Sequence, residues 1–174
     1  MTDLIWTKAF EMVIGNEGGY TNTSADRGNW TSGKIGIGEL KGTKYGISAM
    51  CYPHLDIANL TLEQARDIYH KDYWCRYKCD CLPDAVGLVL FDSVVNSNAK
   101  RMIKLLQETL GVSADGIMGN QTIGACHRLP QKQIINNFLD KRLNYLMSLK
   151  DWKYFGKGWA NRIKHTREYA EGLI

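Results

Sequence analysis

The sequence changes its pattern near residue 48, and this change limits the possible folds more than any other feature. From there to the C-terminus, apolar residues recur at spacings of three and four, which is typical of amphipathic helices. The same spacing occurs earlier over residues 4–16. We therefore expect a mainly α fold, with further helices over residues 61–77, 84–96, 99–110, 120–128, 130–149 and 159–171.

Local residue types mark the ends of several of these segments. Thr61 and Gln64 form a capping box at the start of one helix. Gly111 follows the last apolar residue of another, where glycine commonly ends a helix. Pro130 precedes a long one. A length of 174 residues suits one domain, or one domain with a small appended lobe.

Residues 20–47 are rich in Gly, Thr, Ser and Asn and poor in large aliphatic residues. Within them, Lys34–Lys41 alternates polar and apolar residues, which predicts a short β-hairpin arm. The pair Gly36 and Gly38 lacks the third glycine of a dinucleotide-binding loop. We therefore expect one small hairpin or irregular region near the N-terminus.

Two features argue against a membrane segment and a secretion signal. The longest apolar run, Ala85–Phe91, has seven residues and contains Gly87, so it is too short to span a bilayer. Near the N-terminus, Asp3 precedes the first basic residue and no long apolar region follows. We expect synthesis in the cytoplasm without a signal peptide, and no stable membrane insertion.

The cysteines are odd in number, which together with the missing signal peptide makes a disulfide framework unexpected. The spacing of Cys75, Cys79 and Cys81 invites a zinc interpretation, but His70 is the nearest histidine and no second ligand pair follows. Free thiols at a helix end and turn are the favoured interpretation. We expect neither a metal nor an organic cofactor.

The net charge of +4 is unevenly distributed. Residues 1–127 carry 12 Lys and Arg against 14 Asp and Glu, whereas residues 128–174 carry 10 against 4. A basic end can attract a polyanion such as nucleic acid, anionic lipid or bacterial cell wall, or it can be a solvated helix surface. Aromatic residues and lysines alternate there, namely Lys150, Trp152, Lys153, Tyr154, Lys157 and Trp159. We favour an aromatic core with a basic exterior over a nucleic-acid site.

Two carboxylates near the N-terminus are the main candidates for catalysis. Glu17 lies where the first helix ends, and the negative end of a helix dipole with partial burial would raise its pKa toward roughly 6. Asp26 follows in a polar segment, where it should stay ionised. Glycoside hydrolysis requires such a contrasting pair. A solvent-facing helix end and an Asx-turn are the structural alternatives for the two residues.

Several separated stretches strengthen this interpretation: Glu17–Tyr20, Asp26-x-Gly28, Gly42–Ser48, Leu90–Asn96 and Leu105–Val112, followed by Asp115-Gly116. In this order they resemble the phage-type N-acetylmuramidases of glycoside hydrolase family 108 and their C-terminal predicted peptidoglycan-binding region. The resemblance extends over roughly residues 8–170. It implies a lysozyme-like helical fold, with a catalytic region over residues 1–97 and a peptidoglycan-binding-like region over 98–174, packed as one compact unit.

The resemblance also implies an activity and a set of residues. The enzyme would cleave the β-1,4 bond between N-acetylmuramic acid and N-acetylglucosamine, with Glu17 as the general acid. Asp26 would stabilise charge or activate water, and Thr43 would assist it; Thr31 is the alternative threonine. A monomer acting on peptidoglycan is expected, released to the wall by a holin or a secretion route.

Other residues have both a binding and a structural interpretation. Tyr20 and Tyr45 could stack on sugar rings or pack the hairpin on the first helix. Asn96 could hydrogen-bond an N-acetyl group, although a helix C-cap is the more common role. Asp92 lies on a mainly apolar helix, so we expect it in a structural salt bridge.

Three other functions stay open at this point. The chain could bind the cell wall without catalysis, or it could serve as an interaction partner of a secretion system. It could also be a zinc amidase or peptidase acting on the peptide stems, although the spacing of His and Cys does not supply the ligands.

Overall fold

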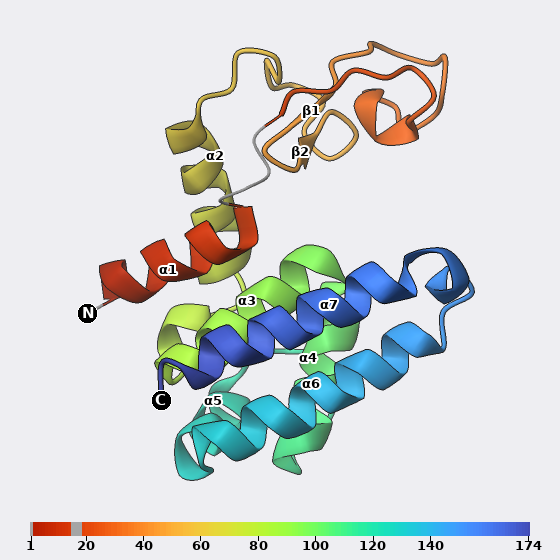
Figure 1. Cartoon of the computed structure of the whole chain (residues 1–174). Coiled ribbons are helices and arrows are strands. Elements are labelled where there is room, and N and C mark those ends of the chain that lie inside the picture. The colour runs from red at the N-terminus through yellow and green to blue at the C-terminus, as the bar shows by residue number, and fades with distance from the viewer. Residues whose placement is uncertain (1, 15–18) are drawn as a thin grey trace. The chain divides into compact units, whose positions relative to one another are not determined.

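The structure, a computed structural model, describes residues 2–14 and 19–174. Over these ranges the chain forms seven α-helices and one two-stranded antiparallel sheet near the N-terminus (Figure 1). It divides into a larger unit, Met1–Ala9 with Asp72–Ile174, and a smaller unit, Phe10–Lys71. The expected mainly α fold with a small strand pair is confirmed.

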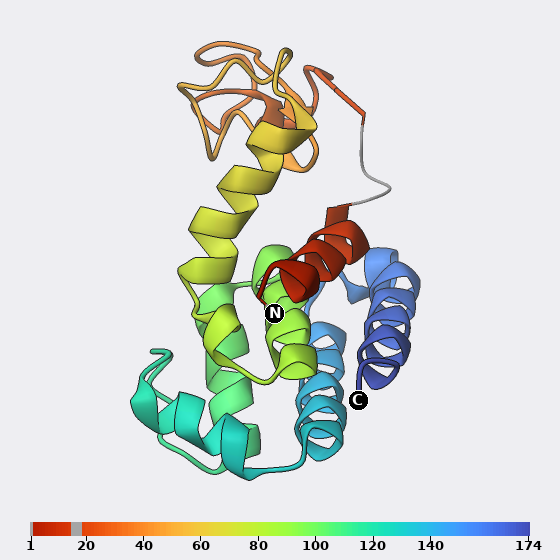
Figure 2. The same ribbon diagram turned by 90° about the vertical axis from the view of Figure 1, so that its left-hand side faces the viewer.

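The larger unit is built around α3 (Asp84–Asn96), in which every residue from Ala85 to Val94 is buried. Three helices pack against it: α4 (Ala99–Leu110), α6 (Gln131–Met147) and α7 (Trp152–Glu171). In both views α6 and α7 lie side by side, and the short α5 (Asn120–Arg128) connects α4 to α6 (Figure 2). Burial on all sides explains why the α3 sequence is almost continuously apolar.

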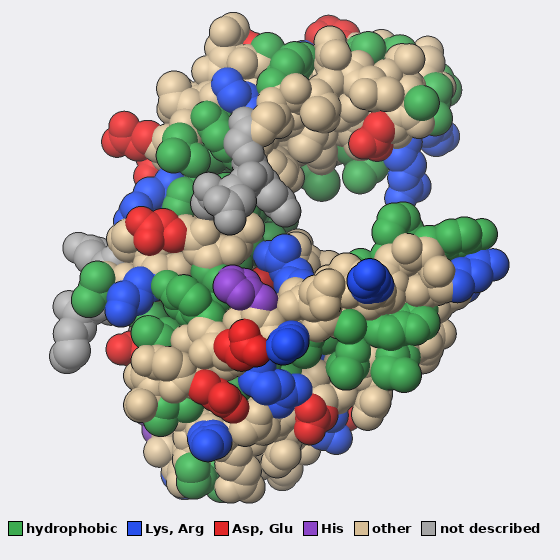
Figure 3. Space-filling view, viewed as in Figure 1, with side chains coloured by type: hydrophobic (Ala, Val, Ile, Leu, Met, Phe, Trp, Pro, Cys, Tyr) green, Lys and Arg blue, Asp and Glu red, His purple; other side chains and the backbone are tan. Residues whose placement is uncertain are grey.

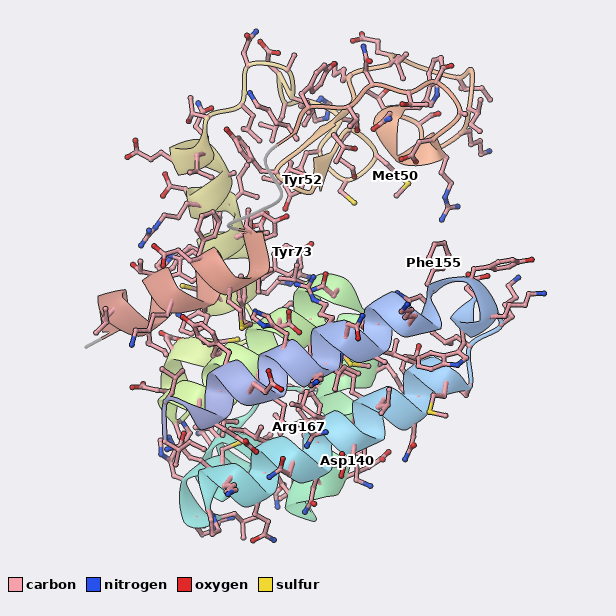
Figure 4. All side chains as sticks on the ribbon, viewed as in Figure 1. Met50, Tyr52, Tyr73, Asp140, Phe155 and Arg167 are labelled. Carbon is pink, nitrogen blue, oxygen red and sulfur yellow. The ribbon has the colours of Figure 1, made fainter. Side chains whose placement is uncertain are left out.

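Aromatic rings fill the core beside α3. Trp6 of α1 (Thr2–Ile14) lies 5.5 Å from Trp74 and 5.3 Å from Phe91, between ring centroids. Gly87 of α3 lets the backbone of Cys79 approach, because an added Cβ would lie 2.5 Å from that carbonyl oxygen. On the surface, Arg167 of α7 donates to the Asp140 carboxylate of α6 over 2.7 Å (Figure 4).

The turn between α4 and α5 is organised by one buried side chain. The Gln107 amide nitrogen lies 2.8 Å from Asp115 Oδ1, 2.9 Å from the Ile117 carbonyl and 3.1 Å from the Thr122 hydroxyl. Its oxygen accepts from the backbone N–H of Gly116 over 2.9 Å. Hydrogen bonds from Ile117 N–H and from Gln107 lower the pKa of Asp115.

The smaller unit contains the end of α1, the strands β1 (Thr43–Lys44) and β2 (Ile47–Ser48), and α2 (Leu62–Tyr69). Thr43 pairs with Ser48, and Lys44 with Ile47. The capping box at the start of α2 is confirmed: Gln64 N–H donates to the Thr61 hydroxyl over 3.1 Å, and Thr61 N–H donates to the Gln64 side chain over 2.9 Å. The helix then continues as a π-helical segment, His70–Cys75.

The hairpin expected over Lys34–Lys41 is wrong. That segment is a series of turns, because Gly36 and Gly38 adopt φ of 80° and 82°, which curls the chain instead of extending it. The strand pair forms instead over residues 43–48.

The last helix begins at Trp152, seven residues before the expected start at residue 159. Gly156 and Gly158 obscure the periodicity there, yet Gly156 is needed because its Cβ would meet the Trp152 ring at 2.6 Å. The aromatic-core interpretation is wrong for Tyr154, which is 72% exposed. The neighbouring Phe155 is 56% exposed. Phe155 projects from α7 on the side away from α6 (Figure 4).

Candidate active site

Glu17 lies outside the described residues, and so does the expected rise of its pKa. The smaller unit contains four described candidates: Asp26, Thr43, Tyr20 and Tyr45. Thr43 lies in β1, and Tyr45 lies in the turn between β1 and β2. Asn96 belongs to the larger unit.

Asp26 begins the short 3-10 helix Arg27–Asn29. Its Oδ1 accepts the backbone N–H of Gly28 over 2.8 Å, and its backbone N–H donates to the Thr23 carbonyl over 3.2 Å. This is the Asx-turn that the sequence allowed as the structural alternative. The turn fixes the direction of an exposed carboxylate, and its second oxygen has no hydrogen-bond partner among the described residues.

Asn29, at the end of the same turn, is fully buried and joins it to β1. The Asn29 Oδ1 accepts the Thr43 hydroxyl over 2.7 Å, and its Nδ2 donates to the Thr23 carbonyl over 3.0 Å. Its backbone carbonyl accepts the N–H groups of Lys41 and Gly42, each over 3.0 Å. A buried amide whose oxygen and nitrogen are both hydrogen-bonded holds its neighbours firmly, because breaking either bond leaves a buried polar group without a partner.

The two candidate threonines have different surroundings. Thr43 lies in β1, and its backbone exchanges hydrogen bonds of 2.8 and 2.9 Å with Thr21. The Thr31 hydroxyl instead accepts the backbone N–H of Glu39 over 3.0 Å, which closes the loop between residues 31 and 39. Thr43 is therefore joined to the Asp26 turn through Asn29, whereas Thr31 holds the loop.

Tyr20 is partly packed against the segment that precedes β1 and partly exposed to solvent. Its hydroxyl donates to the Lys41 carbonyl over 3.0 Å, and 39% of the residue is exposed. Gly42, with φ of 89°, leaves room for the ring, because an added Cβ would lie 2.6 Å from Tyr20. The ring also borders a cavity of about 350 Å³ with Leu40 and His54.

Tyr45 occupies an unusual backbone position in the loop between β1 and β2. Its φ is 52° and that of Gly46 is 75°, the arrangement of a two-residue type I′ turn. A tyrosine in this region is strained. The Tyr69 hydroxyl of α2 donates to the Tyr45 carbonyl over 2.9 Å and holds the turn in place.

The expected salt bridge of Asp92 is confirmed. Arg142 Nη1 lies 2.6 Å from Asp92 Oδ2, and Arg162 contacts Oδ1 at 2.9 Å. Asn96 is the last residue of α3, and its side-chain nitrogen donates to the Asp92 carbonyl over 2.8 Å. Its role in binding an N-acetyl group stays a prediction.

The described part of the chain contains no group of three or more His, Cys, Asp or Glu side chains placed to hold a metal ion. Burial raises the pKa of the Cys79 thiol well above its usual value and that of Cys126 to about 12. Among the helices of these described ranges, none is long and apolar enough to cross a membrane.

Sequence reasoning missed Asn29 and Arg142. A signal existed for Arg142, because a carboxylate on the apolar α3 needs a cation, yet the partner lies 50 positions away. Asn29 carried no such signal, since asparagine is common in turns and only the fold buries it. On the face drawn in Figure 3, the basic side chains over α6 and α7 are intermixed with acidic ones.

Comparisons with known proteins identify the family. The family model described as glycosyl hydrolase 108 matches residues 10–97, and the one described as predicted peptidoglycan domain matches residues 101–164. Among solved structures, SagA of Brucella abortus matches with 30% sequence identity and a TM-score of 0.80, covering 98% of this chain and 95% of that one. No curated protein matches. The chain therefore belongs to the glycosyl hydrolase 108 family and carries a predicted peptidoglycan domain after the hydrolase region.

Proposed function

We propose that the protein is an N-acetylmuramidase, which cleaves the β-1,4 bond between N-acetylmuramic acid and N-acetylglucosamine in peptidoglycan. Glu17 protonates the glycosidic oxygen as the bond breaks. Asp26 stabilises the positive charge that develops on the sugar, or activates the water that attacks it. Thr43 helps to position the Asp26 turn and the water. The family membership supports the reaction class.

The observation that carries the proposal is the buried Asn29 link. The Asn29 side chain accepts the Thr43 hydroxyl over 2.7 Å, and the Asn29 backbone N–H donates to the Asp26 carbonyl over 3.1 Å. The turn that carries the exposed Asp26 carboxylate and the Thr43 hydroxyl therefore belong to one hydrogen-bonded structure. Catalytic groups must be held before the substrate arrives if they are to favour the transition state. The Asp26 turn and β1 meet that requirement, because the buried Asn29 holds them together by hydrogen bonds.

Tyr20 and Tyr45 are suited to the sugar rings, since each offers an aromatic ring and a hydrogen bond holds each residue in place, through the hydroxyl of Tyr20 and the backbone carbonyl of Tyr45. Asn96 can bond an N-acetyl group through its side-chain oxygen. The enzyme needs no cofactor in this scheme, and it meets the wall after release from the cytoplasm by a holin or a secretion route.

The test compares wild type with Glu17→Gln on purified peptidoglycan. New reducing ends are reduced with borohydride, and the fragments are identified by mass spectrometry. Wild type should release disaccharide-peptides that end in reduced N-acetylmuramic acid, and Glu17→Gln should release at least about a hundredfold fewer. Glu11→Gln is the matched control, because Glu11 is an exposed residue of α1 and undergoes the same chemical change.

Asp26→Asn tests the second carboxylate. Asparagine keeps the oxygen that accepts Gly28 N–H, so the turn should survive while the charge is lost. Activity should fall by about a hundredfold or more with an unchanged melting temperature. A folded wild type that releases no fragments would instead favour a non-catalytic wall-binding protein or a secretion-system partner.

A further inference from the structure

The larger unit has a pocket of about 360 Å³ where the end of α3 faces α6 and the first half of α7. This volume is within the range of small-ligand sites. Its lining combines the polar residues 96–98, two leucines of the α6 end and the following turn, and Gly158 with the aromatic side chains of Tyr145 and Trp159 and the cations Arg142 and Arg162. No acidic residue is among the described residues that line it.

The pocket has an excess of positive charge. Arg142 and Arg162 both line it, and both pair with the single carboxylate of Asp92, which is 1% exposed. One of the two guanidinium charges is therefore left without a countercharge in this cluster. The Arg162 side chain is 28% exposed, so it can still meet a ligand. Arg101, stacked 5.4 Å from the Tyr145 ring, adds a third cation beside the pocket.

One donor in the pocket wall has no acceptor. Arg142 is 2% exposed, and its Nη1 bonds Asp92 and Ser93 over 2.6 and 3.1 Å. Its Nε is buried and has no hydrogen-bond partner among the described residues. Because this Nε is enclosed, the guanidinium that a ligand in the pocket can reach is that of Arg162.

The rest of the lining suits a ligand that combines an apolar surface with an anion. Trp159 lies in the pocket, and its ring centroid is 5.8 Å from that of the exposed Phe155. Aromatic rings beside guanidinium groups bind ligands that combine an apolar surface with an anion. Peptidoglycan offers that combination, because its stem peptides bear free carboxylates and its muramic acid bears a lactyl carboxylate where the stem has been removed.

We propose that this pocket binds a carboxylate of peptidoglycan, and that it is a ligand site of the predicted peptidoglycan domain. The inference rests on peptidoglycan being the substrate of the proposed function. Arg162 meets the carboxylate directly, while Asp92, which is itself bonded by Arg142, holds Arg162 in position. The aromatic residues Tyr145 and Trp159 cover the uncharged part of the ligand.

Gly158 allows the pocket to be filled without removing any hydrogen bond. It lines the pocket, and an added Cβ meets nothing within 4 Å. Gly158→Leu should therefore occupy the pocket while strengthening the helix, and Gly158→Ala is the matched control that leaves most of the space open. Arg162→Gln removes the accessible charge instead.

Binding is measured by calorimetry with three soluble probes. They are the free stem tetrapeptide, the same peptide with its carboxylates amidated, and N-acetylmuramic acid, whose lactyl carboxylate is free. None of them contains the bond that the enzyme would cleave. A failure of this inference therefore shows in calorimetry, and a failure of the muramidase proposal shows in the fragment assay.

We expect wild type and Gly158→Ala to bind at least one probe with a free carboxylate, less tightly as salt increases. Gly158→Leu and Arg162→Gln should each lose at least tenfold in affinity, and the amidated peptide should not bind. Binding of the stem peptide or of N-acetylmuramic acid would identify the source of the carboxylate. Equal affinity of wild type and Gly158→Leu, or no binding of either carboxylate by wild type, would overturn the proposal.

Discussion

Replacing Asp92 by asparagine should destabilise the larger unit more than any surface substitution. Asp92 is 1% exposed and Arg142 is 2% exposed, with 2.6 Å between their charged atoms. Asparagine keeps the size of the side chain but removes its charge. Arg142 would then remain as a buried cation without a countercharge.

The size of the loss follows from burial. Removing one partner of a buried ion pair costs about 3–5 kcal/mol, because the remaining charge stays desolvated. Asp92 also accepts from Arg162 over 2.9 Å and from the Thr166 hydroxyl over 3.2 Å, so several contacts weaken together. Arg162→Gln should cost only about 1 kcal/mol, because that side chain is 28% exposed and water compensates it.

Urea unfolding followed by tryptophan fluorescence measures the loss of unfolding free energy. Trp6, Trp74, Trp152 and Trp159 all lie in the larger unit, so the signal reports mainly on it. A double-mutant cycle with Arg142→Met supplies the control, because removing both charges should cost less than the sum of the single losses. A loss below about 1 kcal/mol for Asp92→Asn, or additive losses in the cycle, would refute the reasoning.

Three further predictions concern buried groups. Gln107→Ala should lower the free energy of unfolding by about 2–3 kcal/mol, since it removes the four hydrogen bonds of this buried amide and leaves the Gly116 N–H without its acceptor; a loss under about 0.5 kcal/mol in urea would contradict this. Gly87→Ala should cost about 1–3 kcal/mol, because the new methyl group would lie 2.5 Å from the Cys79 carbonyl, and an unchanged melting temperature would show that the helices shift freely. Iodoacetamide at about pH 8 should modify the exposed Cys51 well before Cys126, whose pKa is raised to about 12, and mass spectrometry of the native and unfolded protein measures the order.

Much of the helical part could be predicted from the sequence because its signals are local. The capping box at Thr61 and the glycine after Leu110 act within one helical turn, and both ends lie where those signals place them. The salt bridge of Asp92 followed from the cost of burying a charge in an apolar helix. Its partners did not follow, because Arg142 and Arg162 are brought there only by the packing of α6 and α7 on α3.

The strand pair shows where local reasoning failed. Alternating residues over 34–41 fit the pattern of a strand, but glycine backbone conformation outweighed that pattern. The true turn contains Tyr45 at φ of 52°, a position that propensity assigns to Asn or Gly. Tyr69 stabilises this turn from α2, 24 positions away, and no local pattern could indicate such a contact.

The candidate site was the hardest part to predict, because its segment has almost no apolar burial. Between residues 19 and 46, Asn29 and Gly42 are buried and the other residues are half-buried or exposed. Hydrophobic periodicity is the main signal in a sequence, and it is silent where hydrogen bonds hold the chain. The bonds of Asn29 to Thr43, Thr23, Lys41 and Gly42 replace an apolar core. A polar framework of this kind leaves carboxylate and hydroxyl groups at the surface, where a hydrated sugar chain can reach them. The same polar character that leaves this segment without a hydrophobic pattern therefore suits it to the substrate we propose.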